Sequence, residues 1–178
     1  TSHIKLTDYI QSVAEKKSEN EVRKTVLHAV VYHLRRYNPN DIQLSRIDKD
    51  YILGFLDYLK TAKQTHTKKE KLLHVNTQVY YYKMLRYCLN YAVSEELISA
   101  NPMNKIKNEE KPHKHRTERE YLTIDELRKL AQTPFYNGLL KKAFLFSCFC
   151  GLRHSDIIAL TWGDIEMDDD GNFRLYII

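Results

Sequence analysis

The sequence predicts a mainly α-helical protein in two parts, a four-helix domain followed by a smaller α+β unit. Apolar residues recur at helical spacing through most of residues 7–96, whereas residues 103–120 have no such period. Alternating apolar residues around an Asp-Gly turn near residue 170 predict a β-hairpin. The length of 178 residues suits one domain or two small ones, and 43% hydrophobic with 29% charged residues is typical of a folded globular chain.

The first two helices are expected over residues 7–17 and 21–37. Thr7 or Asp8 is a suitable N-cap for the first, because each side chain can accept a hydrogen bond from a free backbone N–H. Valines and leucines spaced three and four residues apart give the second helix one apolar face. It should stop at Asn38-Pro39-Asn40, a turn sequence.

The third and fourth helices are expected over about residues 48–62 and 76–96. Asn76 or Thr77 is the expected cap of the fourth helix. Short spacers between the helices favour a small bundle. We therefore assign residues 1–102 to one helical domain.

Residues 103–120 are expected to form an interdomain linker. They carry six Lys and Arg residues among four glutamates and have no helical apolar period. A positively charged segment of this kind can follow a phosphate backbone, but solvated linkers of mixed charge are equally common. His113 and His115 have no further ligands nearby, so we expect no metal site.

Residues 121–178 are assigned to the second unit. Thr123 followed by Glu126 forms a capping box that should start a helix reaching about residue 132. The run from residue 139 to 150 is apolar nearly all round and predicts a buried central helix, which Gly151 should end.

The cysteines and the chain ends carry further expectations. Cys88, Cys148 and Cys150 suggest neither a disulfide framework nor a zinc site and are interpreted as core residues. No stretch approaches the roughly 20 apolar residues that span a bilayer, and the first residues have no signal-peptide core, so an intracellular protein is expected. Both ends of the chain look cut, and we expect the second domain to be incomplete.

The charge is unevenly distributed along the chain. Residues 1–120 hold 22 Lys and Arg against 15 Asp and Glu, net +7, whereas residues 121–178 hold 6 against 8, net −2. A basic half of this kind is expected of a polyanion binder, although composition alone does not separate DNA from RNA or anionic lipid. A solvated surface without a partner explains the charge equally well.

Arg153 is the most informative single residue. It precedes a predicted short helix, where a cation opposes the helix macrodipole at a cost of about 0.3 to 1 kcal/mol. A bound anion would explain this position, because backbone N–H groups and a guanidinium can converge on a phosphate. Asp156 can hold the guanidinium in one rotamer. A local ion pair between the two residues without any ligand is an equally good interpretation from position alone.

One segment of the second unit reads Gly151-Leu152-Arg153-His154-Ser155-Asp156-Ile157 and is followed by Leu160-Thr161-Trp162. It resembles the segment that carries the first catalytic arginine in the tyrosine recombinase (phage integrase) family. Residues 121–127 resemble the start of that family's catalytic domain, and residues 82–102 resemble the end of its core-binding domain. The resemblance covers nearly the whole chain and is greatest to integrases of bacterial mobile elements and conjugative transposons. It implies a four-helix SAM-like core-binding domain, then part of an α+β catalytic domain.

The resemblance also implies an activity. Family members break and rejoin double-stranded DNA through a 3'-phosphotyrosyl intermediate, without metal or other cofactor, membrane or small-molecule substrate. Arg153 would contact the scissile phosphate and Asp156 would support it. The full-length protein would form tetramers on DNA in the bacterial cytoplasm, associated with the nucleoid.

This chain departs from the family pattern in one respect that matters for catalysis. No His-x-x-Arg motif lies in residues 121–178, and none of the thirteen tyrosines stands in the nucleophile's place. We therefore expect the 178-residue chain alone to be unable to cleave DNA.

DNA contacts are expected on the fourth helix, the segment before it and the linker. Polar and aromatic side chains at three- and four-residue spacing suit phosphate and base-edge contacts. The predicted contact residues are Lys68, Lys69, Lys71, Asn76, Thr77, Tyr80, Lys83, Tyr87 and Arg116.

Two other classes of function explain part of the sequence. A DNA-binding regulator or architectural protein without chemistry explains the basic helices and the missing nucleophile, but not the segment around Arg153. A helical protein-interaction module leaves the net charge of +7 in residues 1–120 unexplained.

Overall fold

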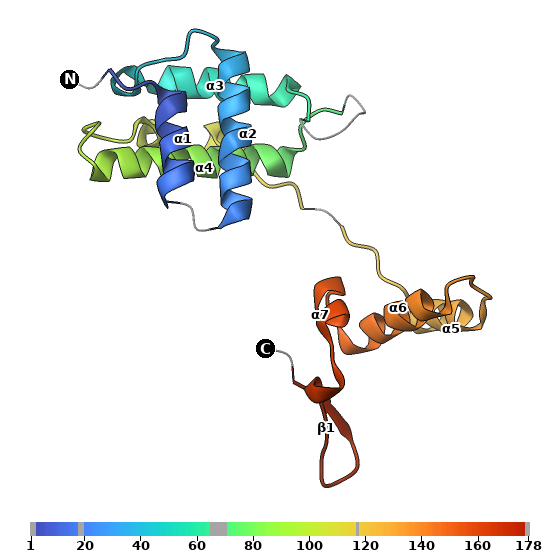
Figure 1. Ribbon diagram of the computed structural model, residues 1–178. Coiled ribbons are helices and arrows are strands. Elements are labelled where there is room, and N and C mark those ends of the chain that lie inside the picture. The colour runs from blue at the N-terminus through green and yellow to red at the C-terminus, as the bar shows by residue number, and fades with distance from the viewer. Residues whose placement is uncertain (1–2, 18–19, 65–70, 117, 177–178) are drawn as a thin grey trace. The chain divides into compact units, whose positions relative to one another are not determined.

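The computed structural model describes residues 3–17, 20–64, 71–116 and 118–176. The chain divides into two compact units, residues 1–117 and 118–178, and each is described by itself (Figure 1). Helices dominate both units, and two short strands form one antiparallel sheet. The predicted mainly α fold class is confirmed.

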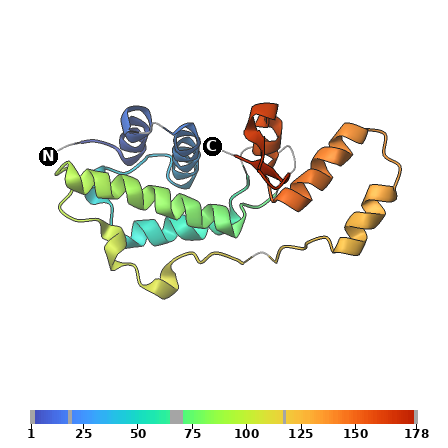
Figure 2. The ribbon, with the colours of Figure 1, turned by 90° about the horizontal axis from the view of Figure 1, so that it is seen from below.

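The described residues of the first unit form four helices in two layers. α1 (Leu6–Lys17) and α2 (Glu21–Tyr37) lie side by side in one layer. They cross α3 (Lys49–Thr61) and α4 (Val75–Ser94), which form the other layer (Figures 1 and 2). Three short 3-10 turns complete the unit, namely η1 (Leu44–Arg46), η2 (Pro102–Lys105) and η3 (Asn108–Glu110).

The apolar faces of these helices meet in one core. Each helix contributes residues at three- and four-residue spacing, as expected for amphipathic helices that pack together. The largest fully buried side chains are Phe55, Leu6, Ile10, Leu27, Leu34, Ile52, Leu59, Leu85, Leu89, Met103, His33 and Val13.

The helix caps agree with the sequence prediction only in part. α2 has the predicted bounds, with Asn20 as its N-cap. Thr7 does not cap α1; its backbone N–H and hydroxyl both donate to Asp41, at 3.2 and 2.7 Å. α4 begins one residue earlier than expected, because the ring of His74 accepts a hydrogen bond from the backbone N–H of Asn76. A His at this position was not recognised as a cap, since Ser, Thr, Asp and Asn are the usual choices.

The start of the expected linker belongs to the helical unit instead. Met103 and Ile106 are 0% and 4% exposed and lie in the core cluster. Buried Asn101 joins this segment to α4: its side-chain amide donates to Asn90 at 2.7 Å and its side-chain oxygen accepts from the backbone N–H of Met103. Predicting a linker from residue 103 was therefore wrong, because two apolar residues three apart are too few to show a helical period.

Replacing Met103 with Ala should lower the free energy of unfolding by about 2 to 5 kcal/mol, because it leaves a cavity in the core. Urea unfolding of the whole chain measures the change. Lys105→Ala, an exposed change in the same turn, should stay within about 0.5 kcal/mol. Equal stabilities of the two variants would place Met103 outside the folded unit.

His33 on α2 is buried among aromatic rings. Its Nδ1 lies 3.4 Å from the Tyr58 hydroxyl, and its ring centroid lies 5.5 Å from that of Tyr81. Among the described residues, Nε2 has no hydrogen-bond partner. Burial, with a smaller contribution from Arg36, lowers the pKa of His33 from 6.5 to about 4. The folded protein therefore holds this ring neutral.

His33 should make stability depend on pH. Since its pKa is lower in the folded state, its full contribution is present above about pH 6.5 and is lost progressively as the pH falls toward 4. Between pH 7.5 and 4.5, the decrease in unfolding free energy should be roughly 2 to 3 kcal/mol smaller for His33→Phe than for the parent chain. Val22→Gln, an exposed change on the same helix that removes no titratable group, is the control and should lose as much unfolding free energy as the parent.

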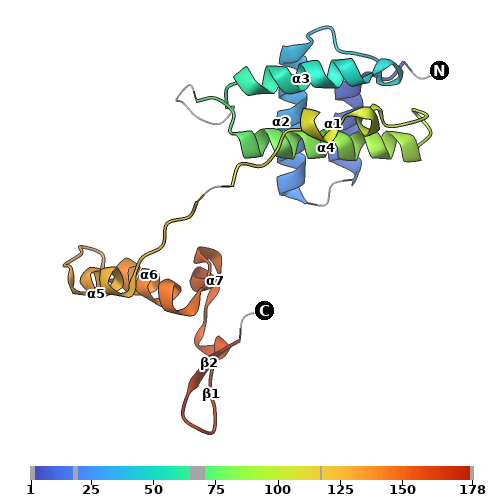
Figure 3. The same ribbon diagram turned by 180° about the vertical axis from the view of Figure 1, so that it is seen from behind.

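The described residues of the second unit form three helices and a hairpin, which Figure 3 shows from behind. The elements are α5 (Ile124–Gln132), α6 (Gly138–Cys150), α7 (His154–Ala159), the 3-10 turn η4 (Trp162–Asp164), β1 (Ile165–Met167) and β2 (Phe173–Leu175). The Thr123–Glu126 capping box is confirmed, with the Thr123 N–H donating to Glu126 at 2.8 Å. Gly151 ends α6 in the left-handed conformation, at φ 67°. The predicted hairpin is confirmed, with Glu166 paired to Arg174.

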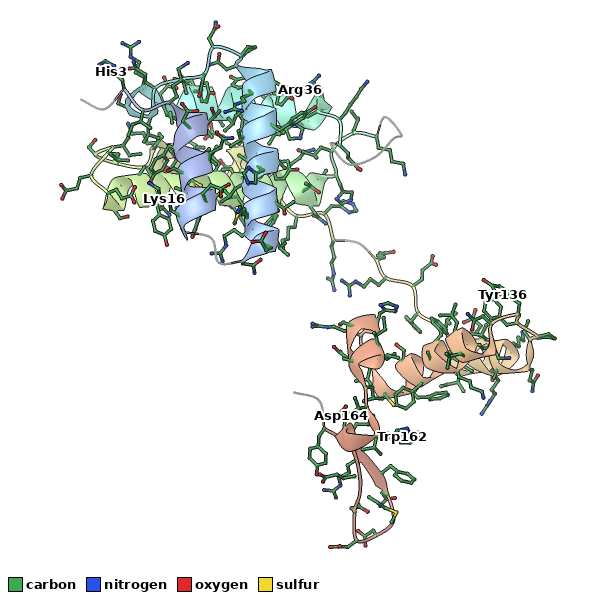
Figure 4. The ribbon with its side chains drawn as sticks, viewed as in Figure 1. His3, Lys16, Arg36, Tyr136, Trp162 and Asp164 are labelled. Atoms are coloured by element: carbon green, nitrogen blue, oxygen red, sulfur yellow. The ribbon has the colours of Figure 1, made fainter. Side chains whose placement is uncertain are left out.

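The predicted burial of residues 139–150 was wrong for the described chain. Among the described residues α6 contains no buried side chain, and the short helices α5 and α7 that contact it leave its apolar residues partly or fully exposed. Cys148 and Cys150 are exposed, whereas Cys88 is buried as expected. Large aromatic side chains also reach solvent in this unit, including Tyr136 and Trp162, which project from the ribbon and are 92% and 89% exposed (Figure 4).

Candidate nucleic-acid interface

A groove follows the outer side of α4 in the first unit. Its volume is about 480 Å³. Five lining residues come from the first turns of α4 and one from the segment after η3; they are Asn76, Thr77, Val79, Tyr80, Lys83 and Lys114. Four of these six are among the contact residues predicted from the sequence.

The helical period of α4 places this groove. Tyr82, Leu85 and Leu89 point inward and are at most 6% exposed. Residues 76, 80, 83 and 87 fall on the opposite side, because they recur three or four positions apart. The same packing that buries one side of α4 therefore presents the other to solvent.

The groove combines positive charge with an aromatic ring. Lys83 and Lys114 are exposed, and Tyr80 is 39% exposed. Of the described residues that line the groove, none is acidic. Ammonium and hydroxyl groups donate hydrogen bonds to phosphate oxygens, and an aromatic ring offers a stacking surface. This chemistry suits a polyanion.

The amide of Asn76 is already engaged within the protein. Its Oδ1 accepts a hydrogen bond from the backbone N–H of His115 at 2.9 Å, and its Nδ2 donates to the carbonyl oxygen of His115 at 3.2 Å. Both bonds hold residues 107–116, here called the strap, against the first turn of α4. The predicted direct contact of Asn76 with DNA thus competes with a contact inside the protein.

A further cation, from α2, joins the outer side of α4. The Arg23 guanidinium lies 5.2 Å from the centre of the Tyr87 ring and donates to its hydroxyl at 3.4 Å. Burial raises the pKa of Tyr87, with Tyr91 adding to the effect and Arg23 opposing it. Arg23 was not among the contact residues predicted from the sequence; its one available signal was a cation in the first turn of a helix, where the macrodipole disfavours it.

Of the five other predicted contact residues, three are described, and none of these three lines the groove. Lys68 and Lys69 fall outside the described residues. Lys71 is exposed, and its carbonyl oxygen accepts a hydrogen bond from Gln64 at 2.9 Å. Arg116 is exposed at the end of the strap, and Tyr87 lies one turn beyond Lys83.

Arg153 and Asp156 sit at the start of α7 in the second unit. The Asp156 carboxylate accepts hydrogen bonds from the backbone N–H of Arg153, at 3.1 Å, and from the Ser155 hydroxyl, at 3.2 Å. Within the described residues, no ion pair joins it to the exposed Arg153 guanidinium. Asp156 therefore caps the start of α7 through the backbone of Arg153.

Comparison with protein-family models gives one match. Residues 5–111, more than half of the chain, match the phage integrase SAM-like domain. The chain belongs to this family. No match was found among curated proteins or among solved structures. The resemblance of the first part to the core-binding region of tyrosine recombinases is thereby confirmed.

The extent of the integrase SAM-like domain agrees with the packing of the first unit. The matched residues include η2 and η3, and Met103 of η2 and Ile106 between the two turns lie in the core. Lys114 and His115 follow the matched residues. The groove is therefore built by the integrase SAM-like domain together with the end of the strap.

The described residues of this family member lack two kinds of feature. None of its helices there is both long and apolar enough to cross a bilayer. The same residues contain no group of three or more His, Cys, Asp or Glu side chains placed to hold a metal ion.

Proposed function

We propose that the first unit binds double-stranded DNA along the outer side of α4. The observation that carries this proposal is the groove that Lys83, Lys114 and Tyr80 line together, with no acidic side chain among its described lining residues. Membership of the phage integrase family supports it, since integrases and recombinases act on DNA. The net charge of +7 over residues 1–120 favours the same partner.

An α-helix fits the major groove of B-form DNA, which is about 12 Å wide. In the proposed complex Tyr80 and Thr77 face the base edges. Lys83, Lys114 and Arg116 contact phosphates, which supply most of the affinity. Lys68, Lys69 and Lys71 belong to the same proposed contact region, together with Arg23 beside Tyr87.

Each lost phosphate contact should lower the slope of log affinity against log salt concentration by about 0.9. Lys83→Gln should therefore weaken duplex binding and reduce the slope by about this amount in a fluorescence-anisotropy titration. Lys105→Gln, an exposed change outside the groove, should leave the duplex affinity and the salt slope unchanged. A salt-independent affinity of the parent chain would count against DNA as the partner.

We also propose that the second unit contributes to DNA breaking and rejoining in the full-length protein. Arg153 is assigned to the scissile phosphate, where it stabilises charge that develops in the transition state. The support is the resemblance of residues 151–157 to the arginine segment of tyrosine recombinases, together with the exposed guanidinium. Asp156 is assigned an indirect role through the backbone of Arg153.

Replacing Arg153 with Ala in the full-length protein should reduce recombination by about 10²- to 10³-fold, because a preorganised donor is lost. Affinity for the duplex should change little, since phosphate contacts elsewhere remain. Arg128→Ala, which removes an exposed arginine of α5, should recombine normally. Equal losses of recombination in the two variants would contradict the assignment of Arg153 to the scissile phosphate.

The remaining parts of the proposal follow from the family resemblance. The 178-residue chain alone should not cleave DNA, because its residues 121–178 lack the His-x-x-Arg motif and a tyrosine in the nucleophile's place. A covalent complex between this chain and a nicked duplex would contradict that. In the full-length protein, the proposal includes tetramers on DNA at the bacterial nucleoid.

A further inference from the structure

The strap is fixed to the helical unit at its first part. The ammonium group of Lys49, at the start of α3, lies 2.8 Å from each carboxylate oxygen of Glu110. Glu110 also accepts a hydrogen bond from the backbone N–H of Lys107 at 2.7 Å. The hydrogen bond from Lys49, followed by that from the Lys107 backbone, lowers the pKa of Glu110, which favours its charged carboxylate. The strap therefore leaves η2 in a defined direction.

Asn76 fixes the strap at its second part. A side-chain amide carries the same donor and acceptor as a peptide group, so the Asn76 amide pairs with the backbone of His115 as a neighbouring strand would. The two hydrogen bonds span 39 residues of sequence. Lys114 precedes the paired residue and lines the groove with Lys83.

We propose that Asn76 is a positioning residue, which docks the strap on α4 so that Lys114 and Lys83 face one phosphate path before DNA arrives. This inference rests on the proposed DNA binding and deepens it. Ordering a long side chain and its backbone during binding reduces affinity, and a strap that is already docked avoids that cost. Asn76 then acts through Lys114 instead of reading a base itself.

A double-mutant cycle on the whole chain tests this role. Asn76→Ala should weaken duplex binding between about two- and tenfold and lower the salt slope by about 0.9, as Lys114→Ala does. The double variant should bind no more weakly than Lys114→Ala, because the two changes remove one contact. Independent, additive losses would overturn the positioning role.

Hydrogen exchange of the His115 amide supplies a measurement that does not depend on DNA. The amide should be protected in the parent chain and should exchange faster in Asn76→Ala. His115→Pro removes the same hydrogen bond from the other partner and should reproduce the loss of affinity. Asn104→Ala, which removes an exposed amide outside the groove, should change neither affinity nor exchange at His115.

The outcomes separate this inference from the proposed function. If the parent chain binds no duplex, DNA binding itself is refuted, whatever the exchange data show. If the parent binds with a steep salt slope while Asn76→Ala binds identically, only the role of Asn76 is refuted. An unprotected His115 amide in the parent chain would likewise overturn the docked strap.

Discussion

The inner side of α4 buries Tyr82, Leu85, Cys88 and Leu89 against the other helices of the first unit. Helix propensity contributes little to the stability of a helix of this length compared with such packing. With one side committed to the core, the helical period leaves residues 76, 80, 83 and 87 on the other. The position of the candidate interface is thus a consequence of core packing.

Polar contacts, here called anchors, then determine which other segment lies on the outer side of α4. Asn101 ties η2 to α4, the Lys49–Glu110 pair orients the strap, and Asn76 holds its end. Each anchor satisfies groups that would otherwise bind water, so its net contribution to stability is modest. Their combined effect is geometric, because they bring Lys114, remote in sequence, beside Lys83.

Much of the secondary structure is predictable from the sequence, because it depends on local signals. The bounds of residues 21–37, the capping box at Thr123 and the hairpin follow from periodicity, capping and turn chemistry. Met103 and Arg23 were missed, because a single apolar residue in a polar run, or one cation on a helix, gains meaning only from distant partners. For the same reason the sequence indicated that Asn76 faces outward but not that its amide binds the strap.

The central claim is that the outer side of α4 and the end of the strap form one DNA-binding surface. Backbone amide NMR of the chain, titrated with a short duplex, tests it directly. The account predicts that the largest shift changes fall on Thr77, Tyr80, Lys83 and Lys114, with the outer residues of α1 nearly unaffected. Shift changes concentrated on α1, with α4 and the strap unperturbed, would contradict it.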